Sequence, residues 1–421
     1  MPSLSRTAFL VTFLAAAFPV LTLTIGGGSL TFYLLALISL GLIATQKGTH
    51  VSPLLLSYRW LLFAFGLSLA TILFSQAVNN VWEGPAIERG LRVSLGLPIL
   101  LAGFLLIDRD RLRHFIWGPV VAGVISTGIV CYLAGPSLRR PPTPQFNAVG
   151  YSNLMLLMAV MTLYSLGWQL TRHPRAERAI KIVVAALTFL GFVLTQTRTG
   201  WMAIPVFAII GIALAGWLRR PLRALAALVC IGLVALAIGA SSQALRDRVT
   251  QGFQEVHNCL TVNPTADTSM CIRLQLWGTS WRMIEQAPWS GIGDRDTFTQ
   301  ALQDGVASGQ VSPFVAQDFG EPHNDFLLAL STYGVLGGIA LLSLYLAPAW
   351  LFVRRLRHAI PSDERVAAAM GLAVCLGFLI FGLTELMFRG MRTVSLYVMF
   401  IALFTALSAP RSDTSRPLAP R

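Results

Sequence analysis

The chain has 421 residues, of which 55% are hydrophobic and only 12% are charged. Because soluble domains carry roughly 25% charged residues, this composition excludes an ordinary soluble protein and indicates that lipid is the solvent. The net charge of +13 does not indicate nucleic-acid binding, since the basic residues are scattered through short turns and form no continuous basic face. We therefore expect a multi-pass protein embedded in a phospholipid bilayer.

Apolar runs that approach the length of a bilayer crossing, about 20 residues, recur along the whole chain. They predict an all-α integral membrane protein with about twelve transmembrane helices. The runs at 30–45, 94–107 and 394–408 are short, so tilted, broken or re-entrant helices are expected there. The expected spans are residues 8–25, 30–45, 60–78, 94–107, 115–133, 151–170, 180–195, 201–218, 224–240, 326–351, 366–388 and 394–408.

The spans divide the chain into four parts. Residues 1–240 hold nine expected helices, 241–325 form one large loop of short helices, 326–408 hold the last three helices, and 409–421 form a tail. Lysines and arginines of the alternate short loops, from Lys47 to Arg416, all fall on one side, which the positive-inside rule assigns to the cytoplasm. We expect both termini to be cytoplasmic and the large loop to face the periplasm, across the bacterial inner membrane.

Two of the cysteines lie in the large loop, in the stretch HNCLTVNPTADTSMC. In an oxidising compartment Cys259 and Cys271 would pair, with a typical gain of about 2 to 4 kcal/mol. The alternative is two free thiols. No zinc-ligand spacing occurs in the sequence, so neither a metal nor another cofactor is expected.

Three motifs place charged or titratable groups on the expected outer face. Arg198 lies in the tight turn LTQTRTGW, Arg273 opens the amphipathic run RLQLWGTSWRMI, and His323 lies in EPHNDF directly before a helix that starts near Phe326. Each has a structural alternative. Arg198 would snorkel to the interface, Arg273 would lie on the solvated face of an interfacial helix, and His323 or Asn324 would cap the next helix.

A second group of candidates surrounds these motifs. Glu385 is an acidic residue at membrane depth, which is costly and is a functional hypothesis by default. Its alternative is a helical pair with Arg389, spaced i, i+4. The other secondary candidates are Arg282, Arg295, Glu321 and Asp325 in the large loop, and Arg139 and Arg140 in LRRPPTPQF.

The motifs and architecture together resemble the O-antigen ligase and polymerase superfamily of bacterial membrane glycosyltransferases. The likeness rests on TRTGW, on RLQLW through PWSGIGD, and on EPHNDFLLALSTYGVLGG. It implies a GT-C-like fold, and the modest length with a single large loop resembles a ligase more than a polymerase. Such ligases move O-antigen glycan from undecaprenyl diphosphate to a sugar hydroxyl of lipid A-core, without ATP or metal.

The resemblance also implies roles for the candidate residues. Arg198 and Arg273 would stabilise the charge on the departing lipid diphosphate. His323 would accept the proton of the attacking hydroxyl, in an inverting displacement, or would hydrogen-bond the diphosphate. Substrate-binding roles are expected for Asn324, Arg282, Arg295, Glu321, Arg389 and Glu385.

Three other interpretations remain open. An O-antigen polymerase uses the same donor with a second lipid-linked glycan as acceptor, and the sequence separates it poorly from a ligase. A protein O-glycosyltransferase of the same superfamily usually has an extra soluble region after the His motif, which is missing here. A twelve-helix secondary transporter predicts two similar halves, whereas the long loop occurs once and late in this chain.

Overall fold

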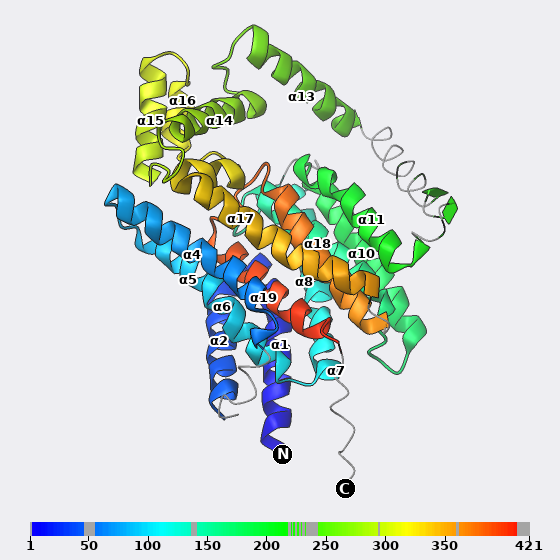
Figure 1. Ribbon diagram of the computed structural model, residues 1–421. Coiled ribbons are helices and arrows are strands. Elements are labelled where there is room, and N and C mark those ends of the chain that lie inside the picture. Colours follow the sequence, from blue (N-terminus) through cyan, green and yellow to red (C-terminus); the bar gives the residue numbers. More distant parts are fainter. Residues whose placement is uncertain are drawn as a thin grey trace.

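The computed structural model describes residues 2–45, 55–135, 141–217, 243–293, 295–358 and 362–410, with positions 220, 222, 223, 225, 226, 229 and 232. This part of the chain folds into helices joined by turns (Figure 1). The helices at the N-terminal side are α1 (Pro2–Thr24), α2 (Gly28–Thr45), α4 (Arg59–Asn79), α5 (Gly84–Ser94), α6 (Gly96–Leu105), α7 (Arg109–Leu112), η1 (Arg113–Ile116), α8 (Trp117–Ala134), α9 (Ala148–Tyr164), η2 (Ser165–Gly167), α10 (Pro174–Leu194), η3 (Thr199–Ala203) and α11 (Ile204–Leu214). The later helices are α13 (Gln243–Thr261), α14 (Ser269–Gln286), α15 (Arg295–Ala307), α16 (Pro313–Asp318), α17 (Asp325–His358), α18 (Ser362–Phe381) and α19 (Met391–Leu407).

The described helices confirm an all-α membrane protein. Seven are long and apolar enough to cross a bilayer, and two shorter apolar stretches accompany them, at Thr199–Leu214 and Met391–Leu407. The expected span at 224–240 falls largely outside the described residues, so the total of about twelve stays a prediction. The seven are Arg6–Thr24, Gly28–Thr45, Arg59–Asn79, Arg109–Ala134, Ala148–Gly167, Asp325–His358 and Ser362–Phe381.

Two of the short apolar runs have different structures. The run at 94–107 is broken, because α5 ends at Ser94 and the ten-residue α6 begins at Gly96. The run at 394–408 is the 17-residue helix α19, which is buried from Thr393 to Leu407. A helix that is apolar on every side belongs inside a protein core, so α19 need not match the thickness of a bilayer.

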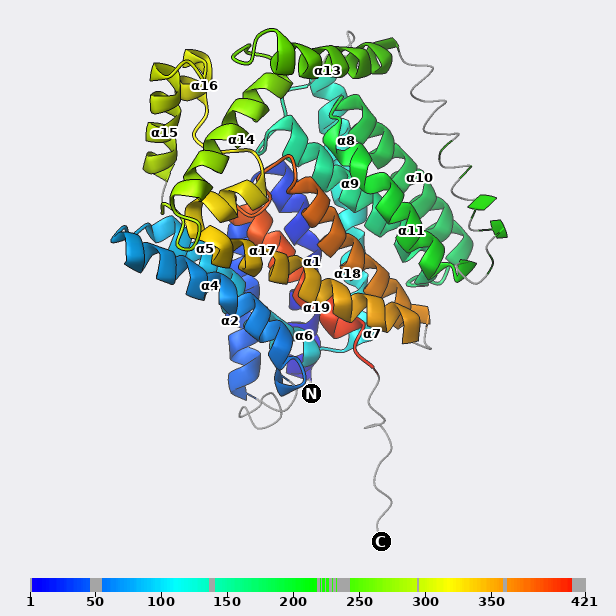
Figure 2. The ribbon, with the colours of Figure 1, turned by 45° about the horizontal axis from the view of Figure 1, so that its top comes forward.

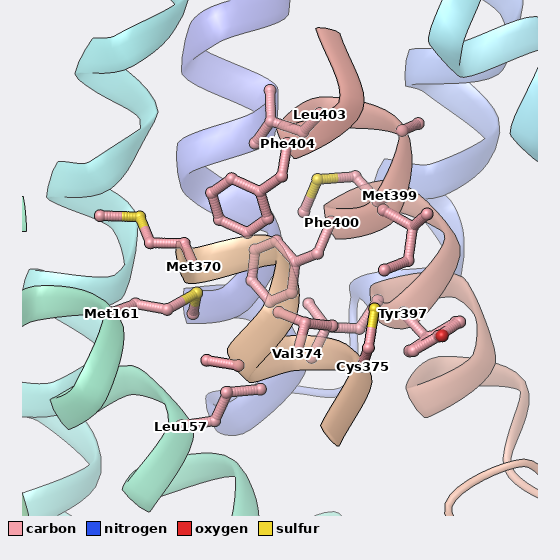
Figure 3. Packing of buried hydrophobic residues seen from close by; sticks show 14 of the residues in the cluster. Leu157, Met161, Met370, Val374, Cys375, Tyr397, Met399, Phe400, Leu403 and Phe404 are labelled. Carbon is pink, nitrogen blue, oxygen red and sulfur yellow. The ribbon is translucent and has the colours of Figure 1, made fainter. Parts of the chain in front are cut away.

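Side chains of α19 form the centre of the packed bundle. Figure 3 shows Phe400 and Phe404 of α19 near Met370 of α18 and Met161 of α9. All four side chains are fully buried, in one apolar cluster that also includes residues of α1, α4 and α17. This cluster holds α17 and α18 in place, and their outward ends carry the motifs discussed below.

The bundle has two chemically different ends. At one end Arg355 of α17 donates to the Thr405 carbonyl at 2.6 Å, and Arg109 of α7 donates to the Ala409 carbonyl at 2.6 Å. Arg365 of α18 donates to Ala213 O at 3.1 Å at the end of α11. Helices α13 to α16 lie at the opposite end, as the two views show (Figures 1 and 2). Basic residues that the sequence assigns to one side therefore gather at one end, away from the large loop.

A kink in α17 attaches the large loop to the bundle. Gly334 has φ 67°, a conformation that favours glycine, and it interrupts the helix. The PWSGIG turn fills the break: Pro288 accepts from Val335 N–H at 2.8 Å, and Ile292 N–H donates to Ser331 at 2.9 Å. A Cβ at Gly334 would collide with the Trp289 carbonyl. The glycine-rich turn that the sequence predicts therefore packs against the kink that Gly334 makes in α17.

Candidate active site

The EPHNDF motif forms the tight entry into α17. His323 has φ 48°, in the left-handed region, and its ring packs edge-on against Phe319 with centroids 5.7 Å apart. The Asn324 side chain accepts hydrogen bonds from Phe326 N–H at 2.9 Å and Leu327 N–H at 3.1 Å. Asn324 therefore caps α17, as the structural alternative expects. Its amide also donates to Leu383 O at 2.9 Å, which leaves little of the group for a substrate.

Glu385 is the partner of His323. Nδ1 of His323 lies 3.3 Å from Oε1 of Glu385. The expectation that Glu385 and Arg389 share the end of the penultimate helix is wrong, because α18 ends at Phe381 and both residues lie in the turn that follows. Without helical geometry the i, i+4 pair is lost, and Arg389 pairs instead with Glu321.

The Glu385 carboxylate is held in its ionised form. Burial raises the pKa of this side chain, but donors around it outweigh burial and leave the pKa below its usual value of 4.5. The donors to Glu385 are His323, the Leu386 N–H at 3.0 Å and the Asn147 amide at 2.8 Å. A buried anion with three donors is suited to fixing the orientation of the imidazole.

Asp325 holds the turn that carries Glu385. Its carboxylate accepts from Met387 N–H at 3.0 Å and from Phe388 N–H at 3.1 Å. The hydroxyl of Tyr345 donates to it at 3.2 Å, and the Asp325 N–H donates to Gly382 O at 2.8 Å. The start of α17 and the turn after α18 are thereby locked together, so the separation of His323 and Glu385 is set by buried contacts.

Helix α9 connects this pair to the TRTGW motif. Asn147 caps α9 by accepting from Gly150 N–H at 2.8 Å, and its amide donates to Glu385. Further along α9, the Ser152 hydroxyl lies 2.6 Å from the hydroxyl of Thr197. Since a helix rises 1.5 Å per residue, about 7 to 8 Å of helix separates these two contacts. Arg198 follows Thr197 directly, and its side chain is exposed.

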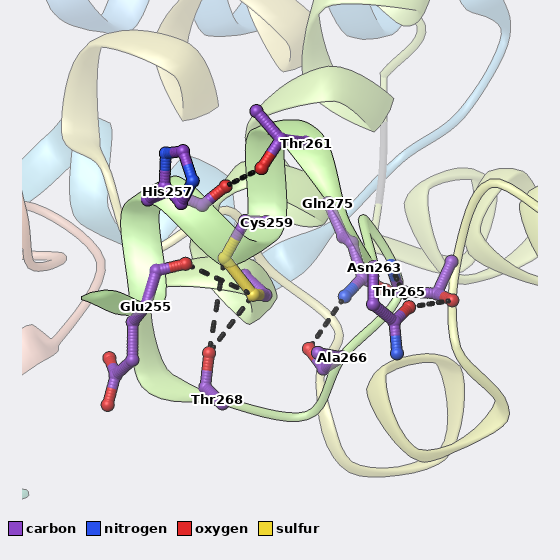
Figure 4. Close-up of a disulfide and its surroundings, with 10 residues drawn as sticks. Glu255, His257, Cys259, Thr261, Asn263, Thr265, Ala266, Thr268 and Gln275 are labelled. Atoms are coloured by element: carbon purple, nitrogen blue, oxygen red, sulfur yellow. Dashed lines mark hydrogen bonds between the residues drawn. A yellow bond between two sulfur atoms is a disulfide. The ribbon is translucent and has the colours of Figure 1, made fainter. Parts of the chain in front are cut away.

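Helix α13 lies over Arg198, and a disulfide ties it to α14. A Cβ at Gly252 of α13 would collide with Nη1 of Arg198, so the guanidinium rests against this helix. Cys259 near the end of α13 is bonded to Cys271 near the start of α14, with Cα atoms 5.3 Å apart (Figure 4). The hydroxyl of Thr268 donates to Cys271 Sγ at 3.0 Å. The disulfide therefore couples the helix over Arg198 to the helix that carries Arg273.

Helix α14 also reaches the His323 segment. The indole N–H of Trp277 donates to the Pro322 carbonyl at 3.1 Å, next to His323. Arg273 precedes Trp277 with i, i+4 spacing, so the two share one face of α14. The structure thus brings the α14 motif and the EPHNDF motif together through Trp277, with Arg273 one helical turn away.

The remaining candidates occupy different places. Arg282 donates to Thr279 Oγ1 at 2.9 Å within α14, away from these contacts. Glu321 and Arg389 form their ion pair beside a narrow cavity, which Arg89 of α5 also lines. The Arg295 side chain and residues 139 and 140 lie outside the described residues. Among the described residues, no group of three or more histidine, cysteine or acidic side chains is placed to hold a metal ion.

Sequence reasoning missed Asn147 and Arg89. Asn147 directly precedes an apolar run, which is the signal for a helix cap, but its bond to Glu385 depends on tertiary packing. Arg89 is a basic residue on the side of the membrane where the other short loops have few. This unusual position of a basic residue is the one sequence feature that marks Arg89.

Comparison with known proteins agrees with the geometry. Residues 183–342 match the family described as O-antigen ligase. Over this segment, 160 of the 421 residues, the chain is similar to that family. The matched segment includes Arg198, Arg273 and His323, and it ends within α17, before Glu385. An uncharacterized protein of Haemophilus influenzae is 24% identical over 353 residues, which cover 77% of this chain and 84% of that protein.

Proposed function

We propose that this chain is an O-antigen ligase, which transfers glycan from undecaprenyl diphosphate to a sugar hydroxyl of lipid A-core. The reaction would take place at the periplasmic face of the inner membrane, with both termini in the cytoplasm. The observation that carries the proposal is the His323–Glu385 pair, held at the end of the bundle where the large loop lies. Contacts through α9 and α14 link this pair to the segments of Arg198 and Arg273.

The chemistry follows from the orientation of His323. If Nδ1–H donates to Glu385, Nε2 is left as the basic nitrogen. As the acceptor hydroxyl oxygen attacks the anomeric carbon, its proton passes to Nε2 and the carbon–oxygen bond to the diphosphate breaks. The new glycosidic bond has inverted configuration, and undecaprenyl diphosphate leaves as an anion. His323 later returns its proton to water.

The arginines would stabilise the departing diphosphate. A guanidinium stays charged at any relevant pH and binds phosphate oxygens through two parallel hydrogen bonds. Arg198 is exposed at the surface of the bundle and rests against α13, and Arg273 lies one turn from the Trp277 contact to Pro322. Binding that strengthens as negative charge develops on the leaving group accelerates the chemical step.

A second candidate is an O-antigen polymerase, because the family match does not distinguish a ligase from a polymerase. Product analysis distinguishes them. Purified protein in liposomes is given undecaprenyl diphosphate glycan with and without lipid A-core, and the products are resolved by mass. Glycan on lipid A-core supports the ligase. Longer lipid-linked glycan without transfer to lipid A-core indicates a polymerase, and the absence of any glycan product contradicts both.

A further inference from the structure

A narrow cavity of about 90 Å³ lies between α4, α5, α17 and the segment leading into α19. Its polar end is lined by Arg89, Arg389 and Tyr333 and by the acidic residues Glu83, Glu321 and Asp325. The apolar lining includes Leu328, Ala329, Leu341 and Leu344, on both sides of the kink in α17. The cavity is therefore charged at one end and apolar at the other.

Arg89 is the unusual group in this lining. The residue is only 9% exposed. Its hydrogen bonds are long, 3.4 Å to the Arg389 carbonyl and 3.4 Å to the Tyr333 hydroxyl. Seven ion pairs form within the described part of the chain, and none of them includes Arg89. A buried guanidinium without an anion is costly to maintain.

Three of the neighbouring charged side chains, Arg389, Asp325 and Arg92, already have partners. Arg389 pairs with Glu321, and Asp325 accepts hydrogen bonds from the 387–388 backbone and Tyr345. Arg92, on the next turn of α5, pairs with Glu88 and donates to Ser29 and Ser395 at 2.9 Å each. The contrast between Arg89 and Arg92 on one helix shows that α5 can satisfy an arginine, and that Arg89 is left with unused donors facing the cavity.

We infer that Arg89 and the Tyr333 hydroxyl form an anion subsite for a phosphate group of a lipid substrate, distinct from Arg198 and Arg273. The guanidinium offers five N–H donors, which match phosphate oxygens. The inference deepens the proposed function, because it assigns a place for the lipid phosphate of the donor or of the acceptor beside the His323 segment.

Binding, rather than turnover, tests the subsite. Purified full-length protein is titrated with undecaprenyl diphosphate and with undecaprenol, which has the same chain and no phosphate, and bound lipid is counted by native mass spectrometry. Arg89→Gln should weaken diphosphate binding by about 10- to 100-fold, as expected for one lost charge-assisted contact, and leave undecaprenol binding unchanged. Tyr333→Phe should cost a few-fold. Arg357→Gln, an exposed arginine at the far end of α17, is the control.

Two further arms identify the source of the phosphate and guard against misfolding. The same variants are titrated with lipid A-core, so selective loss of one lipid assigns the subsite to that substrate. Arg89→Gln should melt no lower than wild type, since it removes a buried charge that has no ion-pair partner among the described residues. If Arg89→Gln fails to fold, the same binding titrations are made with Arg89→Lys and Tyr333→Phe. The inference is overturned if the variants bind undecaprenol and undecaprenyl diphosphate with equally reduced affinity. It is also overturned if their affinity for undecaprenyl diphosphate and for lipid A-core is unchanged. Because no catalysis is needed, this result is independent of whether transfer occurs.

Discussion

His323 Nδ1 lies 3.3 Å from Glu385 Oε1, although 62 residues separate the two in the chain. Each belongs to a segment that enters or leaves a membrane helix, and Asp325 fastens the two segments together. Glu385 therefore acts as a positioning residue for the imidazole. Its other oxygen is occupied by the Asn147 amide at 2.8 Å, so rotation of the carboxylate away from His323 is restrained.

Substitution Glu385→Gln should lower the turnover number for glycan transfer on the order of 10- to 100-fold. The amide preserves the shape of the side chain but no longer fixes the ring tautomer or stabilises a protonated imidazole. The KM values for both lipids should change little, because Glu385 is not proposed to touch substrate in this role. An increase in donor KM with unchanged turnover would show instead that Glu385 binds the donor.

The pH dependence of stability gives a separate prediction for the same residue. Because the folded-state pKa of Glu385 lies below 4.5, its ionised form stabilises the fold above the unfolded pKa, and this contribution is lost as pH falls through the folded value. The melting temperature of wild type should therefore exceed that of Glu385→Gln between pH 6 and 8 and converge with it below about pH 4.5. A gap that is constant down to pH 3 would contradict this assignment.

Gly252→Ala should reduce transfer without reducing stability. The added methyl group collides with Nη1 of Arg198, the mobile end of a flexible side chain, so the guanidinium moves and the fold does not. Alanine also favours helix over glycine by about 1 kcal/mol. The matched control is Gly128→Ala, whose methyl group meets no neighbouring atom within 4 Å. Equal activity of both variants would mean that the position of Arg198 against α13 is unimportant.

Loss of the disulfide should loosen the large loop. In Cys259→Ala/Cys271→Ala we expect a loss of about 2 to 4 kcal/mol in loop stability and faster proteolysis between α13 and α14. Reductant should have the same effect on wild type. The pairing itself is checked by thiol labelling in a variant whose three other cysteines are alanine. Labelling of Cys259 or Cys271 without reductant would show that the bond is absent in the membrane protein.

The sequence marks the candidate site residues, but it does not indicate their partners. Arg198, Arg273 and His323 stand out because turns and helix ends are marked by local signals, namely glycine, proline and changes of hydrophobic period. The capping alternative for Asn324 is confirmed by its bonds to Phe326 and Leu327. These features depend on a few neighbouring residues, so they can be recognised without a structure.

The partners of Glu385 and Arg389 were not predictable in the same way. The apolar run 366–388 hides the end of α18 at Phe381, and the hydrogen bonds that form the following turn come from Asp325, far away in the chain. Arg89 is similar, because only the packing of α5 against α4 and α19 places it beside Tyr333 and away from an ion-pair partner among the described residues. Long-range burial, rather than local propensity, determines these charges.

The most direct test of the central claim is transfer of glycan from undecaprenyl diphosphate by purified wild type and by His323→Ala, Arg198→Ala and Arg273→Ala, with Arg357→Ala as a control. Folding of each variant is verified by its melting temperature. We expect each of the three site variants to lose about 100-fold or more of the transfer rate, and the control to keep it. Transfer at the wild-type rate in His323→Ala would contradict the proposed site.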